Sequence, residues 1–177
     1  MSYTSLYKVF KTKRVELAEF RNSQGSAPPV WGWLTEKFLP GTGYWFSNCD
    51  SLWKLALDKR VPLDVRLCHA FTFDYAVVLP EHFERMSQAC AEMNNVLNEW
   101  PKWHNCVNHW GAFSEFFKTC KVQHKITKRR FGIGMRCTSV TDMWDDYPRH
   151  GTSNRVFDCV GYVLKGEGRA DDDTRDG

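Results

Sequence analysis

The chain has 177 residues, of which 42% are hydrophobic and 15% aromatic, and its formal net charge at pH 7 is +3. Eight tryptophans and twelve phenylalanines supply enough apolar surface for one packed core, which excludes an intrinsically disordered chain. The sequence has no apolar run of the ~18 residues that a membrane span needs and does not begin with the layout of a signal peptide. We therefore expect a cytoplasmic protein that does not cross a membrane.

The first elements are predicted from alternation and from the positions of prolines. Residues 5–10 alternate well enough for a strand, whereas residues 14–21 are compatible with a short helix. Pro28 and Pro29 stand where prolines open helices, and that helix is expected to run through Phe38.

The following stretch mixes short elements of both kinds. Residues 44–46 form a predicted short strand or turn, and a helix is expected across residues 52–56. The period-two pattern of residues 71–79 favours a strand, while residues 63–70 leave a helix open.

Two apolar stripes at helical spacing are the clearest signals in the chain. The first covers residues 83–100 and the second residues 103–117, and Pro101 separates them. The connection is so short that the two helices should pack as an antiparallel hairpin.

The last third of the sequence predicts strands followed by a tail. Strands are expected over residues 121–126, 131–140 and 155–164, and residues 165–177 form a predicted disordered acidic tail. We therefore expect a single α+β domain over residues 1–164, in which an antiparallel helical hairpin packs on a small, mainly antiparallel sheet.

The cysteine count indicates buried thiols. Seven cysteines are scattered along a chain without a secretion signal, and an odd number at wide spacing does not suggest a disulfide framework. Cysteine is among the most buried residue types, so these thiols are expected to be free and to pack in the core.

The charge is unevenly distributed along the chain. Seven basic residues and no acidic one lie between Lys118 and Arg136, which predicts a basic hairpin. Such a segment can bind phosphates or an acidic protein surface, and it can also serve only as a charged edge that discourages aggregation. The residues predicted to contact a partner are Lys121, Lys125, Lys128, Arg129 and Arg130.

A second set of residues has the composition of a zinc site. Cys106 and His109 are one helical turn apart, and Cys120 and His124 follow after ten residues. Tetrahedral zinc needs four such ligands, so a zinc-stabilised nucleic-acid-binding protein is one alternative. The competing interpretation is two buried thiols and two ordinary histidines, with no metal and no cofactor.

Residues 43–56 suggest a second alternative. The run Gly43-Tyr44-Trp45-Phe46-Ser47 followed by a helix resembles the strand-to-helix segment that forms the nicotinamide pocket of ADP-ribosyltransferases. The resemblance implies an enzyme that uses NAD. However, the early strand offers Tyr7-Lys8 in place of the expected tyrosine followed by histidine or arginine, and no late strand carries the expected catalytic glutamate. No catalytic residues are therefore predicted.

A scattered set of residues between 17 and 117 resembles small accessory proteins of tailed bacteriophages. The resemblance is carried by Glu19 to Trp31, Leu52-Trp53, Thr72-Phe73-Asp74 and His109-Trp110. It implies a non-enzymatic protein in the host cytoplasm that binds and inhibits a host or defence protein, and possibly nucleic acid. The same region offers Arg21, Asn22, Asp74 and His109 as polar groups beside large apolar residues. They form either a polar pocket or a structural network of hydrogen bonds.

Overall fold

The computed structural model describes residues 2–9, 14–47, 49–73, 75–103, 106–127, 132–137 and 157–168. They form helices packed on one five-stranded sheet, which confirms the predicted α+β fold. No helix in these ranges is long and apolar enough to span a bilayer.

The sheet has the strand order β2-β1-β4-β3-β5. All neighbouring strands are antiparallel except β3 and β5, which are parallel. The strands are β1 (Tyr3–Val9), β2 (Arg14–Arg21), β3 (Ala76–Val78), β4 (Gly132–Cys137) and β5 (Phe157–Asp158).

The helices supply the second layer of the fold. They are α1 (Ala27–Phe38), α2 (Cys49–Lys54), α3 (Leu63–Phe71), α4 (Phe83–Glu99), α5 (Trp110–Thr127) and α7 (Cys159–Gly168). Short 3₁₀ turns over Ser23–Gly25, Trp45–Ser47, Pro80–His82 and Pro101–Trp103 connect them.

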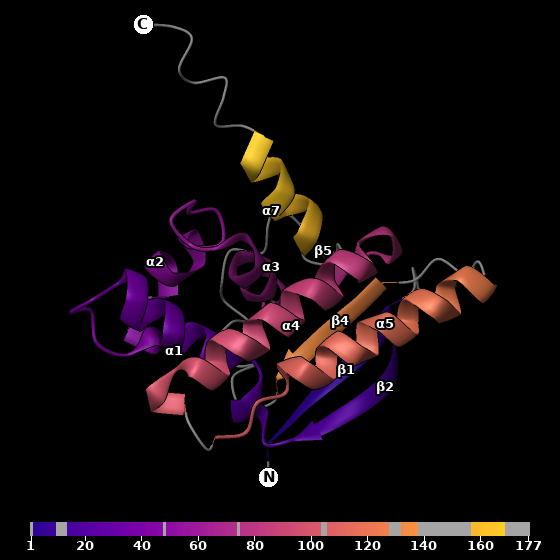
Figure 1. Ribbon diagram of the computed structural model, residues 1–177, viewed down its shortest axis with the longest axis horizontal. Helices are drawn as coiled ribbons and strands as arrows, with labels where there is room; N and C mark the ends of the chain where they lie inside the picture. Colours follow the sequence, from indigo (N-terminus) through magenta and orange to yellow (C-terminus); the bar gives the residue numbers. More distant parts are fainter. Residues whose placement is uncertain are drawn as a thin grey trace, which may run out of the picture.

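Helices α4 and α5 run antiparallel in front of the sheet, as the two apolar stripes predict (Figure 1). Helix α4 also packs against α3 and α1, so it is the central helix of the molecule. The prolines of α1 lie in its first turn and are buried, as expected for prolines at the start of a helix.

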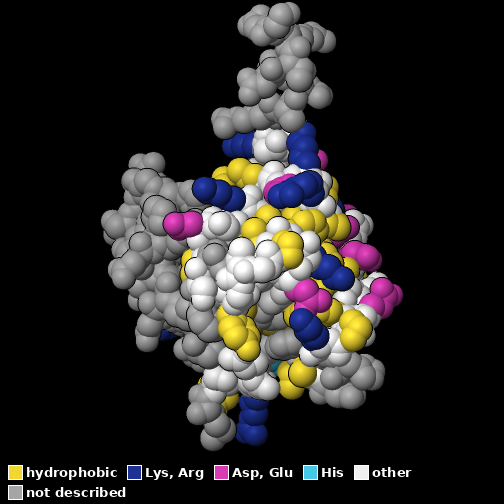
Figure 2. Space-filling model, turned by 90° about the vertical axis from the view of Figure 1, so that its left-hand side faces the viewer, with side chains coloured by type: hydrophobic (Ala, Val, Ile, Leu, Met, Phe, Trp, Pro, Cys, Tyr) yellow, Lys and Arg dark blue, Asp and Glu magenta, His cyan; other side chains and the backbone are white. Residues whose placement is uncertain are grey.

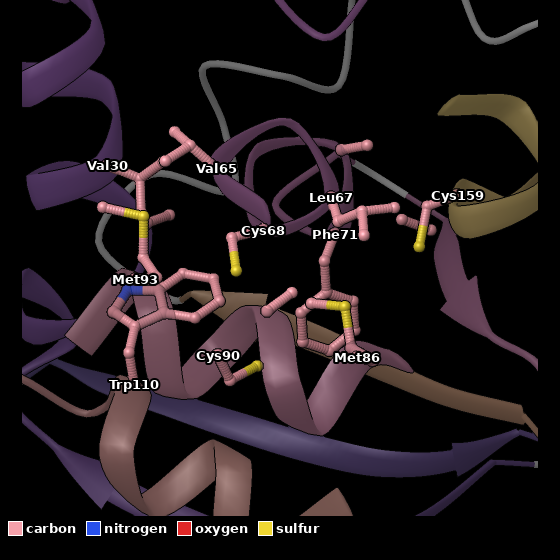
Figure 3. Packing of buried hydrophobic residues seen from close by; sticks show 14 of the residues in the cluster. Val30, Val65, Leu67, Cys68, Phe71, Met86, Cys90, Met93, Trp110 and Cys159 are labelled. Carbon is pink, nitrogen blue, oxygen red and sulfur yellow. The ribbon is translucent and has the colours of Figure 1, made fainter. Parts of the chain in front are cut away.

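Large aromatic and sulfur-containing side chains fill the core around α4 (Figure 3). Trp31, Trp110, Phe71, Phe83, Phe113 and Phe117 are completely buried. Of the seven cysteines, five are buried, Cys49 is half-buried and Cys106 is exposed. All seven are free, so the prediction of buried thiols is confirmed for five of them.

The predicted helix over residues 14–21 is wrong, because these residues form strand β2. They pair with β1 from Tyr3↔Arg21 to Val9↔Arg14, with a bulge opposite Leu6 and Tyr7. The residues suit a helix locally, and pairing with the neighbouring strand overrides that preference.

The predicted strand over residues 155–164 is largely wrong as well. Among its described residues, 157–164, only Phe157 and Asp158 are in a strand, and Cys159–Gly168 form helix α7. Its buried residues Cys159, Val160 and Val163 recur at helical spacing. The predicted strand over residues 71–79 is likewise reduced to Ala76–Val78, because α3 extends to Phe71.

Helix α7 also takes up the first residues of the predicted tail, which therefore does not begin at residue 165. The buried guanidinium of Arg66 donates to Glu167, with 2.5 Å between Nη1 and Oε1, and this ion pair ties α7 to α3. The rest of the predicted tail, residues 169–177, lies outside the described residues.

His69 on α3 is a buried histidine that the sequence does not single out. Its ring stacks on Trp53 with 5.3 Å between centroids, and its Nε2 lies 2.8 Å from the carbonyl oxygen of Leu52. Its Nδ1 is buried without a hydrogen-bond partner. Burial lowers the pKa of His69 from 6.5 to about 4, because the charged imidazole would lose its hydration.

We predict that His69 makes the fold sensitive to mild acid. The unfolded chain takes up the proton near pH 6.5 and the folded chain only near pH 4, so stability falls as the pH drops through this window. The loss should amount to about 3 kcal/mol, as estimated from 1.36 kcal/mol per pKa unit. His69→Gln, which keeps a donor for Leu52, should flatten that part of a stability profile measured by urea unfolding. An unchanged profile would show that His69 is not the titrating group.

Candidate functional site

The predicted basic segment lies on a helix for most of its length. Residues 121–126, predicted as a strand, belong instead to α5, which continues to Thr127. No glycine or proline interrupts this segment, and the buried stripe of the helix reaches Cys120. Lys128, Arg129 and Arg130 lie outside the described residues, as do the side chains of Lys121 and Lys125.

Helix α5 carries Lys118, Lys121 and Lys125 at intervals of three and four residues. Of these three lysines, the structure describes only the side chain of Lys118. The buried side of the same helix carries Trp110, Phe113, Ser114, Phe117 and Cys120. Lys118 is exposed and pairs with Glu115 at 2.5 Å.

Three residues that flank basic stretches of the sequence meet at one end of the sheet. Val9, the last residue of β1, pairs with Arg14 at the start of β2 and with Gly132 at the start of β4. Val9 and Arg14 flank segment 10–13 and Gly132 follows segment 128–131, and both segments lie outside the described residues. In the sequence these segments contain no acidic residue and carry Lys11, Lys13, Lys128, Arg129 and Arg130.

The charge of Lys8 links this end of the sheet to α5. Burial raises the pKa of the Cys120 thiol to about 11, and the nearby ammonium group of Lys8 acts against that rise. The charge of Lys8 on β1 therefore acts on the Cys120 thiol of α5. We use the name basic end for residues 118–130 of the sequence together with Lys8 and Arg14 of the paired strands β1 and β2.

The dipole of helix α5 gives some of its lysines a structural role. Cations near the carboxyl end of a helix interact favourably with its dipole, which contributes about 0.3–1 kcal/mol for an exposed charge. This role accounts for one or two lysines of the last turn and not for the basic residues that precede β2. By contrast, basic and acidic side chains are interspersed on the side of the molecule that carries α1 and α2 (Figure 2).

The predicted polar set around His109 forms a network of hydrogen bonds between the N-terminal hairpin and the start of α5. The Nε2 atom of His109 lies 3.0 Å from the carbonyl oxygens of both Arg21 and Asn22, and its backbone N–H donates to Gly25 at 3.0 Å. The His109 ring also packs against Phe20, with 5.4 Å between centroids. Three of the four predicted residues therefore meet, mainly through backbone atoms, whereas Asp74 lies outside the described residues.

Further buried hydroxyl groups, which the sequence analysis did not select, extend this network. The Ser26 hydroxyl donates to Thr4 at 2.7 Å, and the indole N–H of Trp110 donates to the Ser26 carbonyl at 2.8 Å. The Cys137 thiol donates to the Ser23 carbonyl at 3.4 Å. Small polar residues are common on protein surfaces, so the sequence does not mark these ones as buried. They are recognised only by their position in the fold, between two buried strands and a helix.

The zinc alternative finds little support in the described part of the chain. Cys106 is exposed, His109 is engaged by two carbonyl groups, and the raised pKa of Cys120 favours the thiol over the thiolate that zinc binds. No group of three or more metal-ligating side chains occurs among the described residues. The side chain of His124 is outside them.

The segment that resembles ADP-ribosyltransferases has a different local structure from the one the resemblance implies. Trp45–Ser47 form a 3₁₀ turn outside the sheet, followed by the short helix α2. The Trp45 ring packs on the buried Trp31 at 4.9 Å between centroids. The strand part of a strand-to-helix nicotinamide pocket is therefore absent from residues 44–47.

Gly25 allows the close approach of His109, so we predict that Gly25→Ala loosens the network. A Cβ atom at this position would lie 2.8 Å from Cδ2 of His109 and 2.8 Å from Cγ1 of Val107. The substitution should cost about 1–3 kcal/mol of unfolding free energy, as expected for overpacking. Val107→Ala removes one of the two contacts and should recover part of the loss in the double variant. Purely additive effects of the two substitutions would contradict this interpretation.

Comparison with known proteins does not assign the chain to a family. No protein-family model, no curated protein and no solved structure matches it. Its function is therefore inferred from its own residues and their arrangement.

Proposed function

We propose that the chain is a non-enzymatic binding protein that captures a macromolecule through the basic end. The resemblance to accessory proteins of tailed bacteriophages suggests an inhibitor of a host or defence protein in the bacterial cytoplasm. The observation that supports the proposal is the strand register, which brings Val9, Arg14 and Gly132 together at one end of the sheet; in the sequence these residues flank two basic stretches.

The distribution of the aromatic residues supports binding over catalysis. Trp31, Trp53, Trp100 and Trp110 are buried in the core, and the described histidines and cysteines include no group of metal ligands. A cluster of like charges has an electrostatic cost that an attached anionic partner removes. The basic end is therefore a better candidate for recognition than the aromatic segments.

The partner of the basic end is expected to carry a dense negative charge. An acidic protein surface and the phosphate backbone of a nucleic acid both meet this description, and their binding differs in its response to nuclease and salt. We favour a protein partner because the resemblance points to a host or defence protein. Binding that disappears with nuclease would identify nucleic acid instead.

We predict that Lys128→Glu, Arg129→Glu and Arg130→Glu together abolish capture of the partner from a bacterial lysate. The reversal replaces attraction by repulsion, and we expect a loss on the order of tenfold or more. Capture would be measured by quantitative mass spectrometry of pull-downs performed with and without nuclease.

The matched control reverses the exposed residues Lys37, Lys54 and Lys165, which changes the net charge by the same amount outside the basic end. This control should capture the partner as the original chain does. Equal capture by both triple variants would remove the basic end from consideration.

A further inference from the structure

Strand β2 is the outermost strand at one edge of the sheet that the described residues form, and its neighbour there is β1 (Figure 1). The outer side of such a strand presents backbone N–H and C=O groups that another extended chain can bind. Val15 and Leu17 of β2 are 40% and 38% exposed, although both side chains are large and apolar. The edge of β2 therefore offers hydrogen-bonding groups together with apolar surface.

A bulge in β2 brings two acidic residues to the same face of the sheet. Ala18 and Glu16 pair with consecutive residues of β1, so Leu17 is an extra residue in β2. In a regular strand the side chains alternate between the two faces, and residues three apart point in opposite directions. The extra residue offsets this alternation, so Glu16 and Glu19 point to the same face.

That face of β2 is directed away from α5. Phe20 lies on the opposite face, because its ring packs on Phe113 of α5 with 5.1 Å between the ring centroids. Arg21 follows Glu19 by two residues and therefore shares the face of the two glutamates. Glu16, Glu19 and Arg21 are exposed, and none of them takes part in an ion pair among the described residues. From Arg21 to Glu16, this face thus carries one positive charge followed by two negative charges.

We propose that the edge of β2 binds an extended peptide by strand addition, and that this peptide carries one acidic and then two basic residues at alternating positions. The residues of β1 that pair with Arg21, Glu19 and Glu16 are two apart in the sequence, so a regular added strand should meet these charges with alternate residues. Opposite charges that face each other across two strands stabilise the pairing. This binding goes beyond the capture of a partner by the basic end and does not depend on it.

The same charges disfavour a second copy of this chain as the added strand. If two β2 strands paired antiparallel along their full length, Glu16 of each copy would face Glu19 of the other. Like charges in directly opposite positions destabilise a sheet, and a bulge in an edge strand also hinders the pairing of two folded edges. A short peptide with complementary charges meets neither obstacle, because it can bend at the bulge.

Two synthetic peptides of the same composition and net charge test the proposal by fluorescence anisotropy with the full chain. The matching peptide is Thr-Glu-Val-Lys-Val-Lys-Thr, and the control peptide is Thr-Lys-Val-Glu-Val-Lys-Thr. We expect the matching peptide to bind about threefold to tenfold more tightly, because its side chains oppose all three charges of β2 correctly and those of the control oppose only one. Methylation of alternate backbone nitrogens of the matching peptide should abolish binding in one phase and preserve it in the other, since only one edge of the peptide faces β2.

The double substitution Glu16→Gln and Glu19→Gln should remove most of the preference for the matching peptide. The control pair Glu81→Gln and Glu99→Gln removes two exposed carboxylates outside β2 and should leave the preference unchanged. No saturable binding of the matching peptide, equal binding of the two peptides, or equal effects of the two pairs of substitutions would overturn the proposal. A dimer of the chain in sedimentation that the matching peptide dissociates would assign the edge to a second copy and contradict the proposal as well.

Discussion

The fold depends on the burial of α4 between α3, α5 and the sheet. Met86, Cys90 and Met93 on this helix are completely buried and contact elements from both halves of the chain. Full burial of a side chain of this size stabilises the fold by about 1.5–3 kcal/mol, so the faces of α4 account for much of the net stability of a small domain. The position of α5 follows from this packing.

This packing separates the roles of aromatic and charged residues. The rings of Trp31, Trp110 and Phe117 lie inside, and the network around His109 holds the start of α5 against the N-terminal hairpin. Farther along α5, the Cys120 thiol is within reach of the charge of Lys8 on β1. A helix fixed at its first turn and supported along its length can present charge at its last turns with little loss of conformational entropy.

The strongly periodic elements could be predicted from the sequence, and those that depend on distant partners could not. Helices α1 and α4 follow from their prolines and apolar stripes. Strand β2 could not be predicted, because its residues suit a helix until β1 lies beside it. Helix α7 was mistaken for a strand because Val160, Val163 and Leu164 are β-branched or large, and their burial against α3 decides otherwise.

The candidate site shows the same division. The sequence groups His109 with Arg21 and Asn22, as a polar pocket or as a structural network, but the use of backbone carbonyls and buried hydroxyls has no sequence signal. The basic segment was recognised from its charge. The pairing of Val9 with both Arg14 and Gly132, which follows that segment, required the strand register, because residues more than a hundred positions apart are brought together only by pairing.

Hydrogen exchange of the native chain tests the central role of α4 most directly. If α4 is the most stable part of the fold, its amides should exchange slowest, together with the residues of α3 and α5 that pack on it, and only through global unfolding. Exchange of the α4 amides as fast as those of the short helix α2 would contradict this account.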